Sequence, residues 1–245
     1  MNRKKKSTHI KRIISDIVEI KRNPIENIFI HYDEDNITEI KALIIGPKDT
    51  PYENGYYLLK LNFSEKYPYE PPKGIFETTN GSIRFNPNLY ENGYICLSIL
   101  GTWSGPKWSA CQTLKSILLS LQTLLNEHPF RNEPSYEDLK ETDERLFNYD
   151  RSIEYHNLSY AICDIIFDLK SYQCFFEIIK NHFLENLETN LNKINYLKSK
   201  YNNKYFNCYI FNSTSVKTDY DTLLNKFNLI TDKLINKKKD KLKVI

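Results

Sequence analysis

The stretch "FNPNLYENGYICLSILGTWSGPKW", residues 85–108, holds an Asn-Pro-Asn turn, a single cysteine and both tryptophans of the chain. It shows no clear helical or strand periodicity, and a long irregular segment in a compact domain is usually functional or disordered. Its many apolar residues argue against disorder. A rigid apolar loop with one thiol suits a shallow site for a large partner, whereas the apolar neighbours of Cys96 also suit a core cysteine. From these residues alone, both interpretations of Cys96 stay open.

On the N-terminal side of this stretch, the sequence predicts one helix and four strands. Apolar residues at positions 10, 13, 14, 17 and 18 follow helical spacing; Ser7 or Thr8 can cap this helix, and Asn23-Pro24 ends it. Four short strand-like runs, separated by turn signals, cover residues 27–32, 38–46, 55–63 and 73–79. Because parallel strands would need helical crossovers between them, these short spacings predict an antiparallel meander.

On the C-terminal side, the sequence predicts helices. A second amphipathic helix is expected to begin after Ser109 and to run to about Glu127. The last proline is Pro134, and residues 135–245 contain neither Gly nor Pro, so this part is expected to be mostly helical. The predicted fold class is therefore α+β.

Composition and charge exclude several classes of protein. The net charge of +3 is too small to indicate nucleic-acid binding, and the basic clusters near both ends are interpreted as solvated termini. No apolar run approaches the about 18 to 20 residues of a membrane span, and none follows the basic N-terminal residues as in a secretory signal. Five cysteines without a Cys-x-x-Cys pair indicate reduced thiols inside a cell, with no disulfide framework and no metal site.

Several separated motifs resemble one known family. The stretch above, preceded by "GPKDTPYENGYYLLKLNF" (residues 46–63) and "YPYEPPK" (residues 67–73), is similar to the catalytic core of ubiquitin-conjugating enzymes. The resemblance covers roughly residues 9–168. It implies an N-terminal helix, a four-stranded antiparallel meander, an active-site loop and C-terminal helices.

A finer resemblance concerns the branch of this family with a long C-terminal extension, the Z type. The segments "CLSILGTWSGPKWS", "NEPSYE" and "TDYDTLLNKFNLITDKL" are similar to that branch. The expected organisation is a basic N-terminal tail (1–8), the catalytic core (9–168) and an α-helical extension (169–245).

The resemblance implies a nucleophilic role for Cys96. In this family the cysteine takes the C-terminal carboxyl of ubiquitin or a ubiquitin-like modifier from a thioester on an activating enzyme. It then passes the modifier to a lysine of a substrate or to a ligase. A thiolate suits this exchange, because it is a strong nucleophile and one thioester replaces another. No cofactor is expected on this chain, since ATP is used by the activating enzyme, and the expected location is the cytoplasm or the nucleus.

Two further residues are expected to take part in the reaction. Asn88 matches the family's turn asparagine, whose amide can donate to the oxyanion formed when an amine attacks the thioester; it can also simply brace the loop. The segment "HPFRNEP" resembles the family's gate but is two residues longer, which makes Glu133 the expected gate acid. The alternative for Glu133 is an exposed loop glutamate. Asn86 departs from the family, which usually has His there, and an amide could hold the turn's backbone in its place.

The resemblance also implies two partner surfaces. Lys11 and Arg12 on the first helix are expected to contact the activating enzyme. Four residues of two loops are expected to contact ligases: Phe63, Trp108, Ser109 and Ala110. The second of these loops is about four residues longer than usual in the family, so ligase choice should differ from that of common members.

Two other functions compete with this interpretation. The first is a non-catalytic ubiquitin-binding or scaffold variant of the same fold; such variants lack the cysteine, so Cys96 argues against it. The second is a cysteine hydrolase that pairs Cys96 with His128 or His156. Hydrolases of that kind usually place the cysteine at a helix N-terminus beside its histidine, and nothing in the sequence indicates such a pairing.

Overall fold

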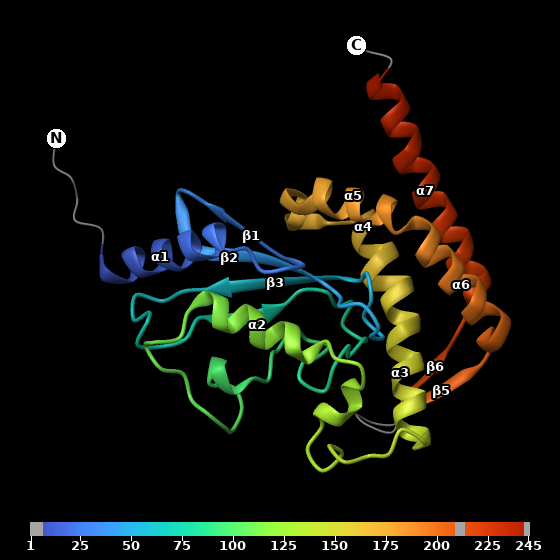
Figure 1. Ribbon diagram of the computed structural model, residues 1–245, viewed down its shortest axis with the longest axis horizontal. Helices are drawn as coiled ribbons and strands as arrows, with labels where there is room; N and C mark the ends of the chain where they lie inside the picture. The colour runs from blue at the N-terminus through green and yellow to red at the C-terminus, as the bar shows by residue number, and fades with distance from the viewer. Residues whose placement is uncertain (1–6, 209–213, 243–245) are drawn as a thin grey trace. The chain divides into compact units, whose positions relative to one another are not determined.

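The computed structural model describes residues 7–208 and 214–242 (Figure 1). Most of the expected N-terminal tail, and the last three residues, lie outside the described residues. Spatial proximity groups the chain into two compact units. The first unit comprises Met1–Pro47 and Tyr57–Asn126, and the second comprises Lys48–Tyr56 and Glu127–Ile245. The expected boundary between residues 168 and 169 stays a prediction, because it concerns family resemblance, whereas these units reflect compactness.

The first unit begins with helix α1 (Thr8–Arg22). The side chains of Ile13, Ile17 and Ile20 are buried, as the helical spacing of apolar residues predicts. The helix ends at Asn23, immediately before Pro24, which cannot continue it. The predicted helix and its C-terminal end are confirmed, whereas Ser7 is the N-cap residue without a capping hydrogen bond from its side chain.

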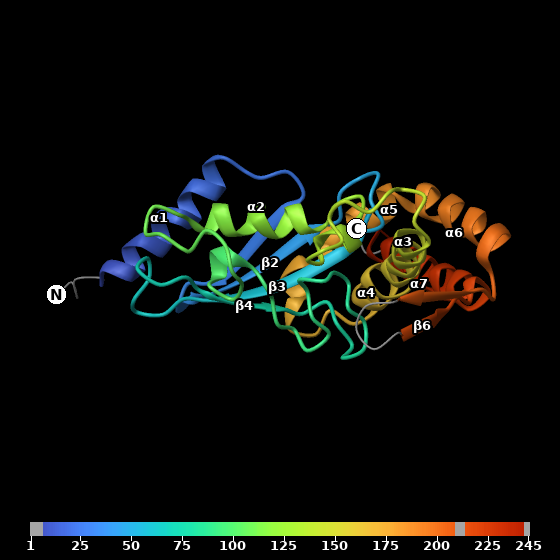
Figure 2. The ribbon, with the colours of Figure 1, turned by 90° about the horizontal axis from the view of Figure 1, so that it is seen from below.

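Four strands form one sheet in chain order: β1 (Ile28–Asp33), β2 (Asn36–Ile45), β3 (Tyr56–Asn62) and β4 (Lys73–Phe76). β1 and β2 pair antiparallel with Ile30 opposite Ala42, and β3 and β4 pair antiparallel with Leu61 opposite Gly74. Helices α1 and α2 cover the same face of this sheet (Figure 2). The predicted meander is confirmed.

Helix α2 (Leu114–Leu124) begins later than the sequence suggested. Its N-cap is Thr113, whose side chain accepts from the Ser116 N–H while the Ser116 hydroxyl accepts from the Thr113 N–H. This capping box fixes the first turn, so the expected start after Ser109 was wrong. Residues 109–112 instead form a turn in which the Gln112 N–H donates to the Ser109 carbonyl.

The second unit is mostly helical, as the lack of Gly and Pro in residues 135–245 predicts. Its helical elements are η2 (Pro129–Asn132), α3 (Glu144–His156), η3 (Asn157–Asp164), α4 (Ile165–Phe167), η4 (Lys170–Phe175), α5 (Phe176–Glu185), α6 (Leu187–Tyr201) and α7 (Tyr220–Leu242). Ile179 and Phe183 of α5 are fully buried, and the Phe183 ring lies 5.0 Å from that of Phe227 in α7. The apolar face of this segment is therefore covered. Among the described helices, none is both long and apolar enough to cross a bilayer.

The extension is mostly helical, as expected, but it also contains two short strands that the sequence analysis did not predict. Strands β5 (Tyr205–Cys208) and β6 (Thr214–Lys217) form an antiparallel pair, with Phe206 opposite Val216. In β5, Phe206 and Cys208 are buried while Tyr205 is exposed. This alternation is the period of a strand with one covered face, which overrides the helix-compatible composition.

The short segment 48–56 belongs to the second unit although residues on both sides of it belong to the first. Its contacts come from the distant C-terminal half. The Asn54 amide donates to the Asn190 side chain at 3.0 Å, and the Asn157 amide donates to the Glu53 carbonyl at 2.8 Å. The second unit is therefore discontinuous in sequence.

Candidate active site

Cys96 lies in the irregular segment between β4 and α2, just before a single 3-10 turn, η1 (Ser98–Leu100). Gly93, three residues earlier, has a φ of 86°. A Cβ at that position would also lie 2.9 Å from the Phe76 carbonyl oxygen of β4. Only glycine tolerates this combination, and it lets the chain run against β4 on its way to Cys96.

The Cys96 side chain points into its own loop. The residue is 5% exposed, and its Sγ lies 3.6 Å from the Thr102 carbonyl oxygen, to which the thiol can donate. Its backbone N–H donates to the Asn88 carbonyl at 2.8 Å. Cys96 thus has the loop position expected of the nucleophile and, in this conformation, the burial expected of a core cysteine.

The other four cysteines divide into two kinds. Cys163 and Cys208 are buried, and burial raises the pKa of both thiols, that of Cys163 to about 12. Cys111 and Cys174 are exposed. Cys111 lies outside α2, which begins three residues after it. Exposed Cys111 and Cys174 are consequently the thiols that any experiment on Cys96 must control for.

Asn86 holds the turn that precedes Cys96. Its side chain is fully buried; Nδ2 donates to the Leu124 carbonyl at 2.7 Å, and Oδ1 accepts from the Asn88 N–H at 2.9 Å. The amide therefore joins the Asn-Pro-Asn turn to the C-terminal end of α2. An amide can do what the family's usual imidazole is expected to do at this position.

The Asn88 side chain reaches the cysteine residue directly. Its Nδ2 donates to the Cys96 carbonyl oxygen at 2.8 Å, so the bracing role is observed. Its Oδ1 is buried and accepts no hydrogen bond from the described residues. The second N–H of the same amide is the group that an oxyanion would need, and that role stays a prediction.

Glu133 directly follows η2 in the second unit. Its N–H donates to the Phe130 carbonyl at 3.1 Å, and its carbonyl accepts from the Tyr136 N–H at 3.1 Å. The residue is half-buried, in contrast to the exposed loop glutamate that was the alternative. Its role as gate acid stays a prediction.

The two residues expected to contact an activating enzyme have different environments. Lys11 is exposed. The Arg12 guanidinium instead bonds within the unit, to the Asp16 carboxylate at 2.9 Å, the Ala110 carbonyl at 2.9 Å and the Gln112 carbonyl at 2.6 Å. Arg12 therefore ties α1 to the segment before α2, and Lys11 is the more accessible of the pair.

Asp16, which the sequence analysis did not single out, organises the loops next to α1. It is 3% exposed and accepts from Arg12, from the Tyr67 hydroxyl and from the Leu114 N–H. Burial, with the hydrogen bond to Asp16, raises the pKa of Tyr67. The only signal in the sequence is an acidic residue on the apolar face of a helix, between Ile13 and Ile17.

Two of the four residues expected to contact a ligase, Phe63 and Trp108, have rings next to that of Tyr67. Phe63 is 6% exposed, and its ring meets that of Tyr67 edge-on at 4.7 Å. The Trp108 indole N–H donates to the Pro68 carbonyl at 2.6 Å, and Ser109 is exposed. Ala110 is half-buried. The structure thus brings the two loops together but leaves little of Phe63 accessible.

The two histidines considered for a hydrolase lie in the second unit. His128 Nδ1 lies 3.1 Å from Asp150 Oδ2. His156 is half-buried, and desolvation lowers its pKa to about 4, so the ring is neutral at pH 7. His128 therefore has an acidic partner, whereas desolvation keeps His156 uncharged.

A charged cluster surrounds a cavity of about 240 Å³ in the second unit. We use the name charged cluster for Glu53, His128, Asp150, Arg151, Glu154 and Lys193. Glu154 accepts from Arg151 at 2.5 Å and pairs with Lys193 at 3.2 Å, while Lys193 also pairs with Glu53 at 3.3 Å. Burial raises the pKa of Asp150 to about 6.

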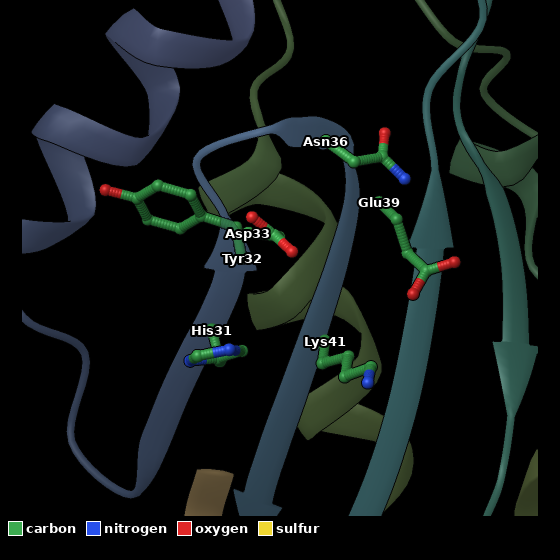
Figure 3. A pocket seen from close by; sticks show the side chains of 6 residues that line it. All are labelled: His31, Tyr32, Asp33, Asn36, Glu39 and Lys41. Carbon is green, nitrogen blue, oxygen red and sulfur yellow. The ribbon is translucent and has the colours of Figure 1, made fainter. Parts of the chain in front are cut away.

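A second, smaller hollow of about 180 Å³ lies on the β1–β2 hairpin of the first unit. His31 and Lys41, which are opposite each other in the strand register, point the same way beside it (Figure 3). Asp33, Asn36 and Glu39 line its other end. Among the described residues, no group of three or more His, Cys, Asp or Glu side chains could hold a metal ion.

Comparison with known proteins decides the family. Residues 12–154, more than half of the chain, match the family model described as ubiquitin-conjugating enzyme. The chain belongs to the ubiquitin-conjugating enzyme family. The α+β fold and the resemblance to the Z branch are thereby confirmed, since ubiquitin-conjugating enzyme E2 Z is among the most similar relatives.

The similarity to E2 Z covers part of each protein. This ubiquitin-conjugating family member is 43% identical to E2 Z of Xenopus tropicalis over 156 residues, which is 63% of this chain and 50% of that protein. It is 43% identical to E2 Z of Homo sapiens over the same length, 44% of that protein. The chain thus spans about half the length of the curated relatives it matches.

Two further similarities were found. The chain is 39% identical over 166 residues to the dual E2 ubiquitin-conjugating enzyme/E3 ubiquitin-protein ligase BIRC6 of Homo sapiens, 64% of this chain and 3% of that protein. Among solved structures, human ubiquitin-conjugating enzyme E2 G1 has a TM-score of 0.41 and 32% identity, covering 46% of this chain and 90% of that chain.

Proposed function

We propose that this chain accepts ubiquitin or a ubiquitin-like modifier as a thioester on Cys96 and transfers it to a lysine of a protein substrate or to a ligase. The observation that carries the proposal is the reciprocal pair of hydrogen bonds between Asn88 and Cys96, both 2.8 Å long. It ties the amide donor to the peptide of the thiol residue. Family membership and similarity to E2 Z support the same reaction.

Loading exchanges one thioester for another. The Cys96 thiolate attacks the carbonyl carbon of the thioester on the activating enzyme, a new C–S bond forms, and the activating enzyme's thiolate leaves and takes up a proton. Bond types on the two sides are the same, so the step needs no large driving force. ATP is consumed earlier, by the activating enzyme, and this chain needs no cofactor.

Discharge makes an amide. The neutral lysine amine attacks the Cys96 thioester, a tetrahedral oxyanion forms, and the C–S bond breaks as the amine loses a proton. Asn88 is the donor to the oxyanion, a role typically worth about 2.7 to 4 kcal/mol in the barrier. Glu133 orients the incoming amine and accepts its proton. The partners are an activating enzyme, for which Lys11 and Arg12 form the contact, and a ligase at the loops of Phe63, Trp108, Ser109 and Ala110.

The test is charging with ubiquitin, an activating enzyme, ATP and magnesium, followed by electrophoresis without reductant. The wild-type protein should give a band that vanishes on adding reductant. Cys96→Ser should give a slower, reductant-stable ester, and Cys96→Ala should give none. Cys111→Ser and Cys174→Ser remove the exposed thiols and should charge normally. Normal charging by Cys96→Ala would overturn the proposal.

One observation favours a second candidate, a non-catalytic ubiquitin-binding variant of this fold. It is the 5% exposure of Cys96, which would leave the thiol without access to a large partner. The charging experiment separates the two candidates. Wild-type protein that binds ubiquitin but stays uncharged with every activating enzyme would establish the binding variant.

A further inference from the structure

The segment after Cys96 folds back over it. Gly101 ends η1 with a φ of 70°, and its N–H donates to the Ser98 carbonyl at 2.9 Å. This left-handed residue reverses the chain, which is the usual role of glycine at such a position. The reversal brings Thr102 against residues 94–97, on either side of the thiol.

The Thr102 side chain contacts both peptide groups that flank Cys96. Its hydroxyl accepts from the Leu97 N–H at 2.9 Å. The same hydroxyl lies 2.7 Å from the Ile95 carbonyl and 3.0 Å from the Leu97 carbonyl, and it can donate its one hydrogen to either. One side chain therefore fixes the backbone immediately before and immediately after the thiol residue.

The Thr102 carbonyl oxygen contacts side chains of the same stretch. It accepts from the Tyr94 hydroxyl at 3.1 Å and lies 3.6 Å from Cys96 Sγ. A carbonyl can only accept, so the contact with sulfur requires the protonated thiol, and a thiolate or thioester would lose it. This contact holds the Cys96 side chain inside the loop, in agreement with its 5% exposure.

We propose that Thr102 is a positioning residue for Cys96: its hydroxyl fixes the peptide groups on both sides of the cysteine, and its carbonyl holds the resting thiol inside the loop until loading. The role of Thr102 in loading rests on the proposed function of Cys96. Its role in sheltering the thiol does not, because that follows from the contacts alone.

The two roles give effects of opposite sign for Thr102→Val, which keeps the shape of the side chain but removes the hydroxyl. Loading should fall about tenfold in kcat, with the KM for the charged activating enzyme unchanged, because the nucleophile is less well placed. Alkylation of Cys96 by iodoacetamide should become severalfold faster, because the loosened carbonyl no longer holds the thiol. Thr102→Ser keeps the hydroxyl and should restore both rates.

The experiment uses the full chain with Cys111 and Cys174 replaced by Ser, and measures alkylation at residue 96 by mass spectrometry. Thr231→Val is the matched control, because it removes a threonine hydroxyl that donates to a helix carbonyl, that of Phe227, at 2.9 Å in α7 of the second unit. It should change neither rate. Should Thr102→Val fail to fold, Tyr94→Phe tests the carbonyl contact from the other side, since Tyr94 is 45% exposed, and should speed alkylation about twofold.

Three results would overturn the proposal: wild-type loading by Thr102→Val, equal impairment of Thr102→Ser and Thr102→Val, or unchanged alkylation in both Thr102→Val and Tyr94→Phe. These results differ from failure of the proposed function. In that case the wild-type chain would not charge at all, while the alkylation rates would still report whether Thr102 shelters the thiol.

Discussion

The loop around Cys96 and the charged cluster of the second unit both contain buried polar groups. In the loop these groups are paired by hydrogen bonds between neutral groups, and in the charged cluster they are paired by ions. Around Cys96, the contacts of Asn86, Asn88 and Thr102 join uncharged amides, hydroxyls and carbonyls. In the charged cluster, Glu154 and Lys193 are joined as ions, and burial shifts the pKa of Asp150 to about 6. Hydrogen bonds between neutral groups do not respond to pH near neutrality, whereas ion pairs do.

This difference has a consequence for the reaction. The backbone on both sides of Cys96, which neutral groups hold, should keep its position over the pH range in which the lysine amine becomes neutral. Any pH dependence of discharge should then arise from the amine and from Glu133. His128, one residue before η2, joins the charged cluster to the segment that ends at Glu133. The raised pKa of Asp150 means that raising the pH through about 6 should destabilise the second unit, while the neutral contacts of the loop stay unchanged.

The largest effect is expected in the loop around Cys96, on the rate of discharge. Asn88→Ala should charge nearly normally but discharge to free lysine about a hundredfold or more slowly. The reason is that Asn88 stabilises the oxyanion, which forms in the transition state of discharge and is absent from the ground state. Single-turnover discharge of the isolated thioester measures this. Asn92→Ala, which removes an exposed amide of the same stretch, is the control. Equal loss of loading and discharge would mean that Asn88 acts only as a brace.

In the charged cluster, Asp150→Asn should remove a pH dependence of the free energy of unfolding. The folded-state pKa of Asp150 is raised to about 6 by burial. A raised pKa means that the folded state favours the protonated form of Asp150. The contribution of this group to the stability of the folded state is therefore complete below about pH 4 and is lost as the pH rises through 6. With about 1.4 kcal/mol per pKa unit, the wild-type protein should lose about 3 kcal/mol of unfolding free energy from this group between pH 4 and pH 7.

Denaturant titrations at several pH values test the prediction. Asp150→Asn should gain stability relative to the wild type as the pH rises, because the amide cannot ionise. His128, Arg151 and Glu154 are the same in both proteins, so the difference between the two curves reports Asp150 together with its contact to His128. A difference that is constant with pH would contradict the assigned burial effect.

A smaller loss of stability is expected when one ion of the charged cluster is removed. Lys193→Met leaves Glu154, 6% exposed, with Arg151 alone. Breaking a fully buried pair costs about 3 to 5 kcal/mol, and because Lys193 is partly exposed we expect about 2 kcal/mol. Lys198→Met on the same helix is the control. Its partner Asp221 is more than half exposed, so solvent screens the pair and the cost should be smaller than for Lys193→Met. Equal losses of stability in Lys193→Met and Lys198→Met would show that the ion pairs of the charged cluster stabilise the fold no more than a surface ion pair does.

The smallest effect is expected for Glu133→Ala, which tests where the pH dependence of discharge arises. At pH 7 only about one lysine amine in several thousand is neutral. The discharge rate should fall about tenfold at pH 7, which is a smaller loss than removal of a general base typically causes. It should recover in part at pH 9. Discharge rates from pH 6.5 to 9.5 measure this. A loss of the same size at every pH would assign Glu133 to loop positioning.

Much of the fold follows from periodic patterns. The isoleucines of α1 and the four short strands could be predicted, because helical and strand spacings are local properties of the sequence. The start of α2 could not, since Thr113 and not Ser109 forms the capping box. The pair β5–β6 was missed because strands of four residues are too short to show alternation against a polar, Asn- and Lys-rich background.

The site was predicted to a different extent. The meeting of Asn88 and Cys96 follows from the family motif, whose spacing the chain keeps. The inward contacts of Arg12 and the burial of Phe63 could not be predicted, because they depend on the tertiary position of Asp16 and Tyr67. Nothing in the sequence marks Thr102, since its contacts require the chain reversal at Gly101.

The discontinuous second unit constrains the order in which the protein can be built. Segment 48–56 leaves the ribosome early, but Asn54 bonds to a residue 136 positions later, and the Glu53 carbonyl accepts from one 104 positions later. Domains made of consecutive residues can fold one after another during synthesis. Here the early segment must wait for η3 and α6, so the second unit cannot be completed until most of the chain has been translated.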